Sequence, residues 1–342
     1  MKVVTFGEIM LRLSPPGFSR FVQAKSLDVN FGGGEANVAV ALAHFGLDAH
    51  FVTKLPAHEI GQAAVNSLRG YGVNTQFVVR GGDRVGIYFL ETGASQRGSK
   101  VIYDRAQSAV TTLRPEELDW EEVFDGARWF HWTGITPALG PQATETLKAA
   151  ISAARAAGAT ISCDLNFRKK LWTQEEAQAT MRPLMEFVDV CIANEEDAEK
   201  CLGITAPSSN VETGHLEEAE YGQVARTLKE TFGFDSVAIT LRESISASTN
   251  GWSAILLDTA DCPQPARSIR YEIQLVDRVG GGDAFASGLI AGLLQKGSTR
   301  DALEFAVAAS CLKQTIPGDV NLVSAEEVDK LIAGGGSGRV DR

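Results

Sequence analysis

Short apolar runs rich in β-branched residues alternate along the chain with longer stretches in which apolar residues recur at helical spacing. After KVVTFGE near the start comes EANVAVALAHFG, where Val38, Leu42 and Phe45 follow one another at intervals of four and three residues. This spacing predicts a helix with one buried face, and Gly46 stands where that helix would end. A strand is expected next, at AHFVTKL.

The same alternation recurs through the middle of the chain. The helical stretch ATETLKAAISAARAAG is followed by the strand-like ATISCDLN and DVCIANEE, then by a long helical stretch and by DSVAITL. Strands that alternate with helices are typical of βαβ units, in which a parallel sheet is covered on both faces. We therefore predict an α/β fold with a central, mostly parallel sheet and helices on both of its faces.

Two segments, at about residues 11–31 and 77–105, break this rhythm. The first carries LSPPG and the alternating SLDVNF, and the second contains two strand-like runs, VGIYFLE and SKVIYDR, joined by the polar TGASQRG. These are hairpin patterns, and so few strands cannot bury two faces of their own. We expect them to form a small β-sheet lid that covers a cleft or pairs with another subunit, within one domain at residues 1–333. The Gly-rich end, residues 334–342, is predicted to be a flexible tail.

The composition narrows the classes of partner. The chain has 342 residues, of which 44% are hydrophobic, enough for a large core. Lys and Arg number 32 against 43 Asp and Glu, which gives a net charge of −11. Because that charge repels polyanions, nucleic acid and anionic membranes are not expected as partners.

Two features of the sequence bear on its location. The N-terminal MKVVTFGEIM lacks the apolar stretch of a signal peptide, and no window approaches the ~18 uninterrupted apolar residues of a membrane span. We therefore expect the protein in the cytoplasm. Its five cysteines are scattered without a CxxC pair, which favours reduced thiols and no structural zinc. They are Cys163, Cys191, Cys201, Cys262 and Cys311.

Candidate chemistry centres on VDRVGGGDAFASG, in which three glycines stand before an apolar helical pattern. Phe285 and Leu289 begin a repeat of four residues that predicts a helix with one buried face. Gly280, Gly281 and Gly282 then lie at its N-terminus, where backbone N–H groups lack intrahelical partners and the helix dipole is positive. Because glycines have no Cβ, a phosphate can approach these N–H groups, and we expect an anion hole here.

Asp283 follows the glycines directly. A carboxylate would repel a resting phosphate, so its position is explained if it accepts a proton from a nucleophile that attacks that phosphate. The helix dipole is expected to keep Asp283 ionised and hence a weak base, which phosphoryl transfer tolerates because the proton can leave late. The alternative is that Asp283 caps a Gly-rich turn and does nothing else.

Other phosphate and metal motifs are absent or weak. The P-loop pattern G-x-x-x-x-G-K-[ST] and the motif HExxH do not occur, and NFGGGEANVAV lacks the G-x-G-x-x-G spacing of a dinucleotide site. A nicotinamide oxidoreductase is therefore disfavoured.

Five motifs together carry a resemblance to a known family. FGE, GGGEANVAVALAHFG, DLNFR, NEED and DRVGGGDAFASGL occur in the order and at the spacing of the ribokinase-like (PfkB) sugar kinases, over nearly the whole chain. Within that family the chain is most similar to 2-keto-3-deoxygluconate kinases. The hallmark D-[TS]-x-G-A-G-D stands here as Asp277 to Asp283, with Arg278 and Gly281 in place of the common Thr and Ala. The resemblance implies a ribokinase-like fold, with Asp283 as catalytic base and the amides of the three glycines stabilising the γ-phosphoryl group in flight.

The resemblance also implies the cofactors, ATP and Mg²⁺, and leaves a requirement for a monovalent cation such as K⁺ open. Asn194 in NEED matches the family's N-x-x-E, which reaches Mg²⁺ and phosphate through water, whereas the last position is Asp197, one methylene shorter than Glu. Thr240 and Arg242 in ITLRES match a segment that leads to the nucleotide phosphates.

The sugar is expected at the N-terminal motif. GGGEAN resembles the sugar-binding signature of the family, which implies that Gly33, Gly34 and Asn37 face the sugar, the glycines allowing close backbone approach. On spacing alone, the same stretch also fits a plain strand-to-helix turn.

An acidic sugar would be bound through arginine, because the planar guanidinium matches a carboxylate. Arg105 ends a lid strand and Arg168 lies just past a predicted parallel strand, near the sheet edge where open α/β folds bind ligands. Both match the acid-sugar readers of the keto-deoxygluconate kinases, as do Tyr88 and Tyr103 on the lid. The alternative is that each arginine forms a surface ion pair.

The function that these motifs predict is ATP-dependent phosphorylation of the terminal hydroxyl of a small sugar acid. The resemblance favours conversion of 2-keto-3-deoxygluconate to 2-keto-3-deoxy-6-phosphogluconate, in Entner-Doudoroff-type catabolism. Two alternatives stay open: a kinase of the same family that acts on a neutral sugar such as fructose or ribose, and a non-catalytic sugar or nucleotide sensor. Apolar lid residues, Ile87, Phe89 and Val101, predict a homodimer formed lid to lid.

Overall fold

The fold is built around one large sheet. The computed structural model describes residues 1–205, 218–258 and 264–335, and ten of the strands in these residues form that sheet. In order across the sheet they are β13 (Ala266–Arg267), β12 (Thr249–Asp258), β11 (Ser236–Ser244), β10 (Val190–Ala193), β9 (Thr160–Asp164), β8 (Ala127–Thr133), β1 (Lys2–Phe6), β4 (Asp48–Leu55) and β5 (Val78–Arg80), with β14 (Tyr271–Gln274) beside β12. From β11 to β5 neighbouring strands are parallel, whereas β12 runs antiparallel to its partners. The predicted α/β fold with a mostly parallel sheet is confirmed.

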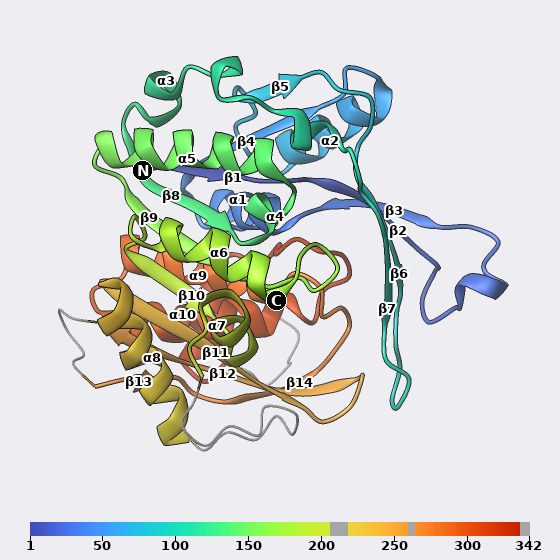
Figure 1. Cartoon of the computed structure of the whole chain (residues 1–342). Helices are drawn as coiled ribbons and strands as arrows, with labels where there is room; N and C mark the ends of the chain where they lie inside the picture. The colour runs from blue at the N-terminus through green and yellow to red at the C-terminus, as the bar shows by residue number, and fades with distance from the viewer. Residues whose placement is uncertain (206–217, 259–263, 336–342) are drawn as a thin grey trace.

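Helices cover both faces of this sheet (Figure 1). They are α1 (Gly34–His44), α2 (Glu59–Gly70), α3 (Trp120–Phe124), α4 (Ile135–Ala138), α5 (Pro141–Ala156), α6 (Gln174–Met185), α7 (Glu195–Leu202), α8 (Glu218–Phe232), α9 (Gly281–Gln295), α10 (Thr299–Lys313) and α11 (Ala325–Ile332), with short 3-10 helices η1 (Phe21–Gln23), η2 (Ala109–Thr112) and η3 (Pro115–Glu117). Val3 of β1 packs into an apolar cluster with α1, α9 and α10, whereas the next residue, Val4, packs into a second cluster with α5, α6 and α8. Because successive strand residues point to opposite faces, the two clusters are the two halves of the core.

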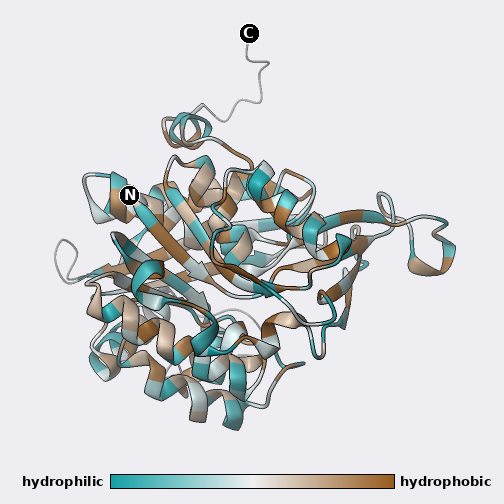
Figure 2. Ribbon diagram, turned by 90° about the horizontal axis from the view of Figure 1, so that it is seen from above, coloured by the Kyte–Doolittle hydropathy of each residue, from teal (hydrophilic) through white to brown (hydrophobic). Residues whose placement is uncertain are grey.

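A second, smaller sheet projects from the body of the fold, as predicted for the lid (Figures 1 and 2). Its strands, in order, are β3 (Asp28–Gly32), β2 (Met10–Ser14), β6 (Ile87–Glu91) and β7 (Lys100–Asp104). The central pair β2 and β6 is parallel and both outer pairs are antiparallel. Each of the two predicted lid segments therefore supplies one hairpin.

The second part of the lid is shorter than the predicted segment 77–105, so the predicted boundary is corrected. Residues Val78–Arg80 form β5, which pairs in parallel with β4 at the edge of the large sheet. Phe77 is buried in the second apolar cluster, so this stretch belongs to the main core and the second part of the lid begins only at β6. The predicted flexible tail at residues 334–342 lies, from residue 336 on, outside the described residues.

Both helices that the sequence places after glycines begin as predicted. α1 begins at Gly34, and α9 begins at Gly281, directly after Gly280. Helices α1 and α10 both pack on α9, and the N-termini of α1 and α9 line one cleft. The fold thus brings together two motifs that lie far apart in the sequence.

Two further expectations from the sequence concern the cysteines and the possibility of a membrane-spanning helix. Cys163, Cys191, Cys201 and Cys311 are buried free thiols, and Cys262 lies outside the described residues. In the part of the chain that the structure describes, no helix has both the length and the apolar composition needed to cross a membrane.

Candidate active site

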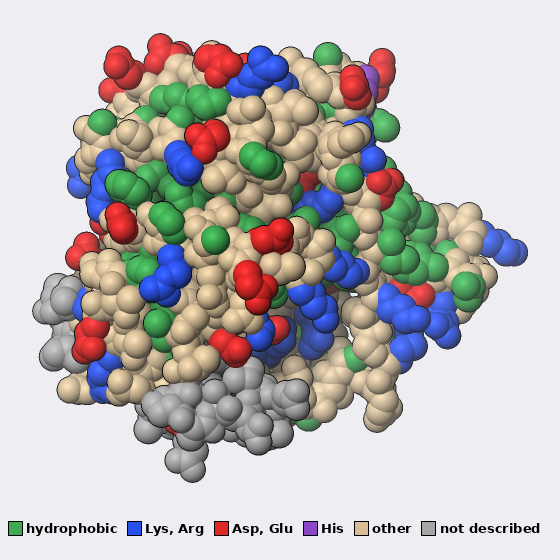
Figure 3. Space-filling model, in the orientation of Figure 1, with side chains coloured by type: hydrophobic (Ala, Val, Ile, Leu, Met, Phe, Trp, Pro, Cys, Tyr) green, Lys and Arg blue, Asp and Glu red, His purple; other side chains and the backbone are tan. Residues whose placement is uncertain are grey.

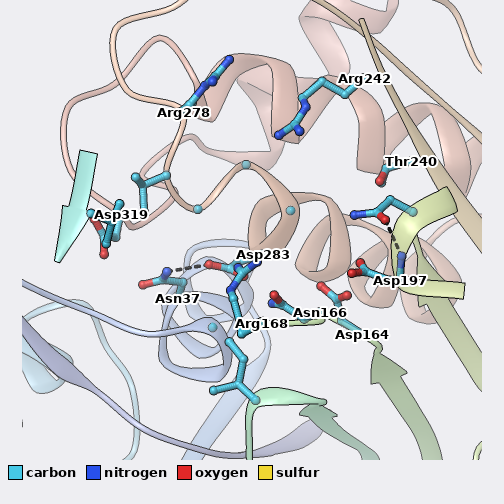
Figure 4. A pocket seen from close by; sticks show the side chains of 18 of the residues that line it. Asn37, Asp164, Asn166, Arg168, Asp197, Thr240, Arg242, Arg278, Asp283 and Asp319 are labelled. Carbon is cyan, nitrogen blue, oxygen red and sulfur yellow. Dashed lines mark hydrogen bonds between the residues drawn. The ribbon is translucent and has the colours of Figure 1, made fainter. Parts of the chain in front are cut away.

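A cleft of about 900 Å³ opens beside the ends of β9, β10 and β11, between the N-termini of α1 and α9 and the lid (Figure 4). This is the edge at which open parallel sheets bind ligands. All of the site residues predicted from the sequence line this one cleft. They are Gly33, Gly34, Asn37, Tyr88, Tyr103, Arg105, Arg168, Asn194, Asp197, Thr240, Arg242, Gly280, Gly281, Gly282 and Asp283.

A turn that ends at Gly280, here called the glycine turn, leads into α9, whose first two residues are Gly281 and Gly282. Gly280 has a left-handed φ of +78°, and a Cβ there would collide with the carbonyl oxygen of Asp319, so only glycine fits. The amide of Gly281 donates to the carbonyl of Arg278 at 3.3 Å and closes the turn. At Gly282 a Cβ would meet no atom within 4 Å, so this position faces open space. An anion therefore has free access to the first turn of the helix.

Asp283 is the third residue of α9 and lies half-buried at the floor of the cleft. It does not cap the helix, because the N-cap is Gly280 and makes no side-chain bond. Burial raises the pKa of Asp283 to about 6, although the hydrogen bond from Asn37 and the charge of Arg168 oppose that rise. Burial therefore makes this carboxylate a stronger base than its place at a helix N-terminus leads us to expect.

Asn37 of α1 holds Asp283 in place. Its Nδ2 donates to Asp283 Oδ2 at 2.6 Å, and its Oδ1 accepts from the amide of Gly33 at 3.2 Å (Figure 4). The flanking glycines bring α1 close, because a Cβ at Gly33 would collide with the carbonyl oxygen of Glu8, and one at Gly34 would lie 3.7 Å from Asp283 Oδ1. The two glycine motifs thus meet at one carboxylate.

A second group of carboxylates lies beside Asp283. Asp164 ends β9, and burial together with the charges of Asp197 and Asp283 raises its pKa well above the usual range. Burial also raises the pKa of Asp197 to about 6. Its Oδ1 accepts from the amide of Phe167 at 2.9 Å, while Asn194 Oδ1 accepts from the amide of Asp197 at 2.8 Å as N-cap of α7. Asn194 thus caps a helix in addition to lining the cleft.

No cluster of three His, Cys, Asp or Glu side chains that could hold a metal ion occurs among the described residues. A divalent cation at Asp164 and Asp197 would need further ligands from water or from a bound phosphate, which is the way Mg²⁺ is usually held.

Arginines line the other side of the cleft. Arg242 on β11 and Arg278 in the turn before α9 face the same space (Figure 4). Arg278 Nη2 donates to Asn250 Oδ1 at 3.0 Å, whereas its buried Nε has no partner. Burial and the charge of Arg242 lower the pKa of Arg278. Two guanidiniums that repel each other beside an open helix N-terminus form a site for a polyanion.

Arg278 is a residue that the sequence motifs did not assign, because it appeared there only as a departure from the hallmark. Thr240, the other predicted nucleotide contact, lines the cleft but donates its hydroxyl to the carbonyl of Ala193 at 3.4 Å.

The two predicted carboxylate readers meet at the cleft but differ in their surroundings. Arg105 is buried, forms an ion pair with Glu8 through Nη2, and leaves its buried Nε without a partner. Arg168, in the loop after β9, is exposed and makes one long hydrogen bond, 3.5 Å, to the carbonyl of Phe167. Its guanidinium is therefore the more available of the two. The sequence motif FGE contained Glu8 but gave no sign of its pairing with Arg105.

The predicted tyrosines hold different positions. Tyr88 is buried and its hydroxyl bonds to the carboxylate of Asp319, while the Tyr103 ring lies 6.0 Å from the Tyr88 ring and 5.5 Å from the Arg105 guanidinium. Tyr103 is thus the freer of the two to meet a ligand.

A buried ion-pair cluster that the sequence did not indicate ties the lid to the glycine turn. Arg12 of β2 binds Asp277 at 2.6 Å and also binds Asp319, and each of these side chains is less than a tenth exposed. Asp277 in turn accepts from the amides of Val279 and Gly318, each at 3.1 Å. The lid strand and the turn before α9 are therefore fastened to each other.

Known proteins are similar to this chain in both sequence and fold. A model of the pfkB family carbohydrate kinases matches residues 1–325. The 2-dehydro-3-deoxygalactonokinase of Haloferax volcanii is 35% identical over 341 residues, which cover 100% of this chain and 99% of that protein. A crystal structure of 2-dehydro-3-deoxygluconokinase from Thermotoga maritima is 54% identical, with a TM-score of 0.93 over 98% of this chain and 100% of that one.

A less similar protein has been solved with ATP and Mg²⁺ bound. An E. coli protein solved in complex with ATP and Mg²⁺ shares the fold, with 19% identity and a TM-score of 0.80 over 97% of this chain and 99% of that one.

Proposed function

Because the chain belongs to the pfkB family of carbohydrate kinases, we propose that it transfers the γ-phosphoryl group of ATP to the terminal hydroxyl of a sugar acid. The preferred acceptor is 2-keto-3-deoxygluconate, also called 2-dehydro-3-deoxygluconate, and the product is 2-keto-3-deoxy-6-phosphogluconate. Two relatives, at 35% and 54% identity, are kinases of 2-dehydro-3-deoxy sugar acids, which supports this choice. The product is the substrate for aldol cleavage in Entner-Doudoroff-type catabolism. We propose that the protein is located in the cytoplasm.

One observation carries the proposal: Asp283 shares one cleft with two separate groups of arginines. Arg242 and Arg278 lie on the side of the glycine turn, where the nucleotide phosphates would bind, and Arg105 and Arg168 lie near the lid. Two cationic patches that share a cleft with one base suit a reaction between two anions, a nucleotide and a sugar acid.

Asp283 acts as the proton acceptor in this reaction. Its carboxylate takes the proton of the attacking hydroxyl as the oxygen–phosphorus bond forms, and the bond to ADP breaks. Asn37 orients the carboxylate through the 2.6 Å bond to Oδ2. The open N–H groups at the start of α9 stabilise the negative charge on the phosphoryl group in transit.

Mg²⁺ fits the group of carboxylates beside Asp283. The negative charges of Asp164, Asp197 and Asp283 repel one another, as the raised pKa of Asp164 indicates, and a divalent cation held mainly by water and by the ATP phosphates would relieve that repulsion. When bound with ATP, Mg²⁺ would neutralise charge on the transferring phosphate.

A neutral sugar is the second candidate acceptor, because Glu8 already neutralises Arg105 and leaves Arg168 as the available guanidinium. A sensor without catalysis is less well supported, since a binding module has no need of a base beside the anion site.

A substrate panel tests the proposal. ADP release is measured with MgATP and, in parallel, 2-keto-3-deoxygluconate, its C4 epimer 2-keto-3-deoxygalactonate, gluconate, fructose and ribose. Turnover with a keto-deoxy acid and not with fructose or ribose supports the assignment. Faster turnover with a neutral sugar would transfer the proposal to the second candidate, and no ADP with any of the five would contradict both.

The rate should depend on pH through the carboxyl group of Asp283. Its pKa of about 6 means that the base is ionised above that pH and protonated below it. We expect kcat/KM for the acceptor to be level near neutral pH and to fall by about tenfold per pH unit below pH 6, because this ratio reports the pKa of the free enzyme. Asp164 and Asp197 titrate in the same cluster, so the apparent pKa belongs to the group.

Initial rates at saturating MgATP and at an acceptor concentration well below its KM, measured between about pH 5 and pH 8, check this expectation. Thermal unfolding over the same range serves as the control that the fold persists. A level rate from pH 5 to pH 7 would contradict the role of Asp283 as base.

The lid offers an apolar surface for a second copy of the chain. Register places Val29, Leu13, Phe89 and Ile102 in one row across its four strands, on the face opposite the buried, cleft-facing Tyr88. Figure 3 shows hydrophobic side chains gathered over this part of the molecule, with Lys and Arg beside them. We propose an isologous dimer through this row, in which each copy covers the other.

The sequence pattern predicts Val101 among the residues of the dimer contact, and the structure corrects that prediction. Val101 pairs with Leu90 and lines the cleft, so it lies on the inner face. The row is instead completed by Val29 and Ile102, which are 61% and 54% exposed.

Ile102→Asp should convert the dimer to a monomer, because the new charge would be buried at the contact. Sedimentation velocity at micromolar concentration measures the change. Ile60→Asp is the matched control, since Ile60 on α2 is 50% exposed and lies outside the lid. A wild-type monomer, or an Ile102→Asp variant that remains a dimer, would contradict the proposed contact.

A further inference from the structure

Lys313 is a fully buried lysine directly behind the glycine turn. It is the last residue of α10, and its side chain is 0% exposed. Its Nζ donates to three backbone carbonyls, those of Asp277 at 3.2 Å, Val279, and Gly318 at 2.7 Å. It does not line the cleft, so neither substrate would touch it.

The side chain is held as the ammonium ion. Burial lowers the pKa of Lys313, while the charges of Asp277 and Asp319 oppose that effect. Three carbonyl oxygens need three N–H donors, and a neutral amine has only two and would point its lone pair at the third oxygen. The three contacts therefore require the protonated form.

These contacts fasten the segment that shapes the anion site. Two of the carbonyls belong to the turn that leads into Gly280, and the third belongs to the loop that includes Asp319. The two segments approach so closely that a Cβ on Gly280 would collide with the carbonyl oxygen of Asp319. Without a cation between them, three carbonyl dipoles would face one another in a buried space.

Several backbone carbonyls that converge on one point are also the way proteins bind a dehydrated monovalent cation such as K⁺. In this chain the cation at that point is covalently attached. We propose that Lys313 serves as a built-in monovalent cation, a positioning residue that holds the turn at residues 277–280 so that the N-terminus of α9 faces the transferring phosphoryl group. It follows that catalysis needs no free K⁺. The sequence alone leaves open whether a monovalent cation is required. This inference rests on the proposed phosphoryl transfer.

The first test uses the unaltered protein. Its rate with MgATP and acceptor is measured in KCl, NaCl and tetramethylammonium chloride at equal ionic strength. We expect equal rates in all three salts, because the tetramethylammonium ion is too large to enter a carbonyl site. Activation by K⁺ over tetramethylammonium would overturn the proposal.

The second test removes the charge with Lys313→Ala, which also leaves room for a small cation among the three carbonyls. We expect kcat to fall by about tenfold, the usual cost of losing a group that orients the reactive ones, with little change in KM for the sugar acid. Addition of NH₄⁺ or K⁺, but not of tetramethylammonium, should restore part of kcat, because a small cation can occupy the vacated space.

Thermal unfolding of the same variant gives a readout that needs no substrate. NH₄⁺ or K⁺ should raise the Tm of Lys313→Ala relative to tetramethylammonium and leave the wild-type Tm unchanged. Lys296→Ala is the control, because Lys296 follows the other end of α9 and pairs with Asp329 near the surface.

Lys296→Ala should show neither the loss of kcat nor the cation effect. A Lys313→Ala variant with wild-type kcat, or one whose kcat and Tm do not respond to small cations, would overturn the proposal. If no sugar is phosphorylated, the Tm experiment still decides the role of Lys313 separately from the function, and if the variant does not fold, the salt comparison on the wild type decides it.

Discussion

Asp283→Asn should lower kcat by about 10²–10⁴-fold while the KM for ATP stays close to that of the wild type. The amide has nearly the same shape as the carboxylate and can still accept the hydrogen bond from Asn37, but it cannot take the proton of the attacking hydroxyl. The open N-terminus of α9 remains, so part of the phosphoryl stabilisation survives. Steady-state rates with 2-keto-3-deoxygluconate and MgATP measure the effect.

Stability provides the first control for this variant. The folded pKa of Asp283, about 6, is higher than its ordinary value of 3.8. Protonation therefore favours the folded state, and this stabilisation, complete below about pH 3.8, is lost as the pH rises from there through 6. Asparagine carries no charge, so Asp283→Asn should have a Tm at pH 7 at least equal to that of the wild type, and any advantage should shrink toward pH 4.

Asp301→Asn is a matched second control. Asp301 is the third residue of α10, as Asp283 is of α9, but it pairs with Ser298 on the surface instead of facing the cleft. We expect this variant to keep the wild-type kcat. If Asp283→Asn retained most of the activity, or if Asp301→Asn lost as much, the assignment of the base would be wrong.

Arg168→Ala should raise the KM for the sugar acid by about 10- to 100-fold, the loss expected for one charge-assisted hydrogen bond to a carboxylate. The KM for ATP should change little, because Arg242 and Arg278 lie nearer the glycine turn. Arg168 is the better choice for this test than Arg105, whose removal would leave Glu8 buried without its ionic partner. Measuring both KM values in the variant separates the two binding sites.

Arg168→Ala has a second expected effect. The charge of Arg168 lowers the pKa of Asp283, so its removal should move the acid limb of the pH profile to higher pH. Rates should therefore be compared at about pH 8, where the base is ionised in both proteins.

Lys170→Ala is the control for Arg168→Ala. Lys170 lies in the same loop but donates to the carbonyl of Val101 and does not line the main cleft. Equal increases in the KM for the acid and for ATP in Arg168→Ala, or the same acid-specific increase in Lys170→Ala, would argue against a carboxylate reader.

Much of the fold and of the cleft could be predicted because the signals are local. The alternation of strand and helix patterns, and the glycines before Phe285, depend on neighbouring residues, and local spacing reports them well. The predicted site residues meet at one cleft because parallel strands bring their carboxyl ends to one edge. β5 was misplaced because a run of three residues carries too little pattern to choose between two sheets.

The parts that could not be predicted depend on contacts between distant segments. Arg12 binds Asp277 and Asp319, which are 265 and 307 residues away, and Arg105 binds Glu8 across 97 residues. No local spacing announces such pairs. The raised pKa of Asp283 could not be predicted for a related reason: the sequence places the residue in the first turn of a helix, but does not show how deeply that turn is buried.

The attachment of Arg12 to Asp277 and Asp319 links the two halves of the catalytic cycle energetically. Because a lid strand and the turn before α9 share these buried ion pairs, any displacement of the lid by the sugar acid alters the free energy of the nucleotide site. Thermodynamic linkage makes such an effect reciprocal, so the factor by which the acid changes the affinity for ATP is the factor by which ATP changes the affinity for the acid. If the acid displaces the lid, these ion pairs make the two ligands heterotropic effectors of one another.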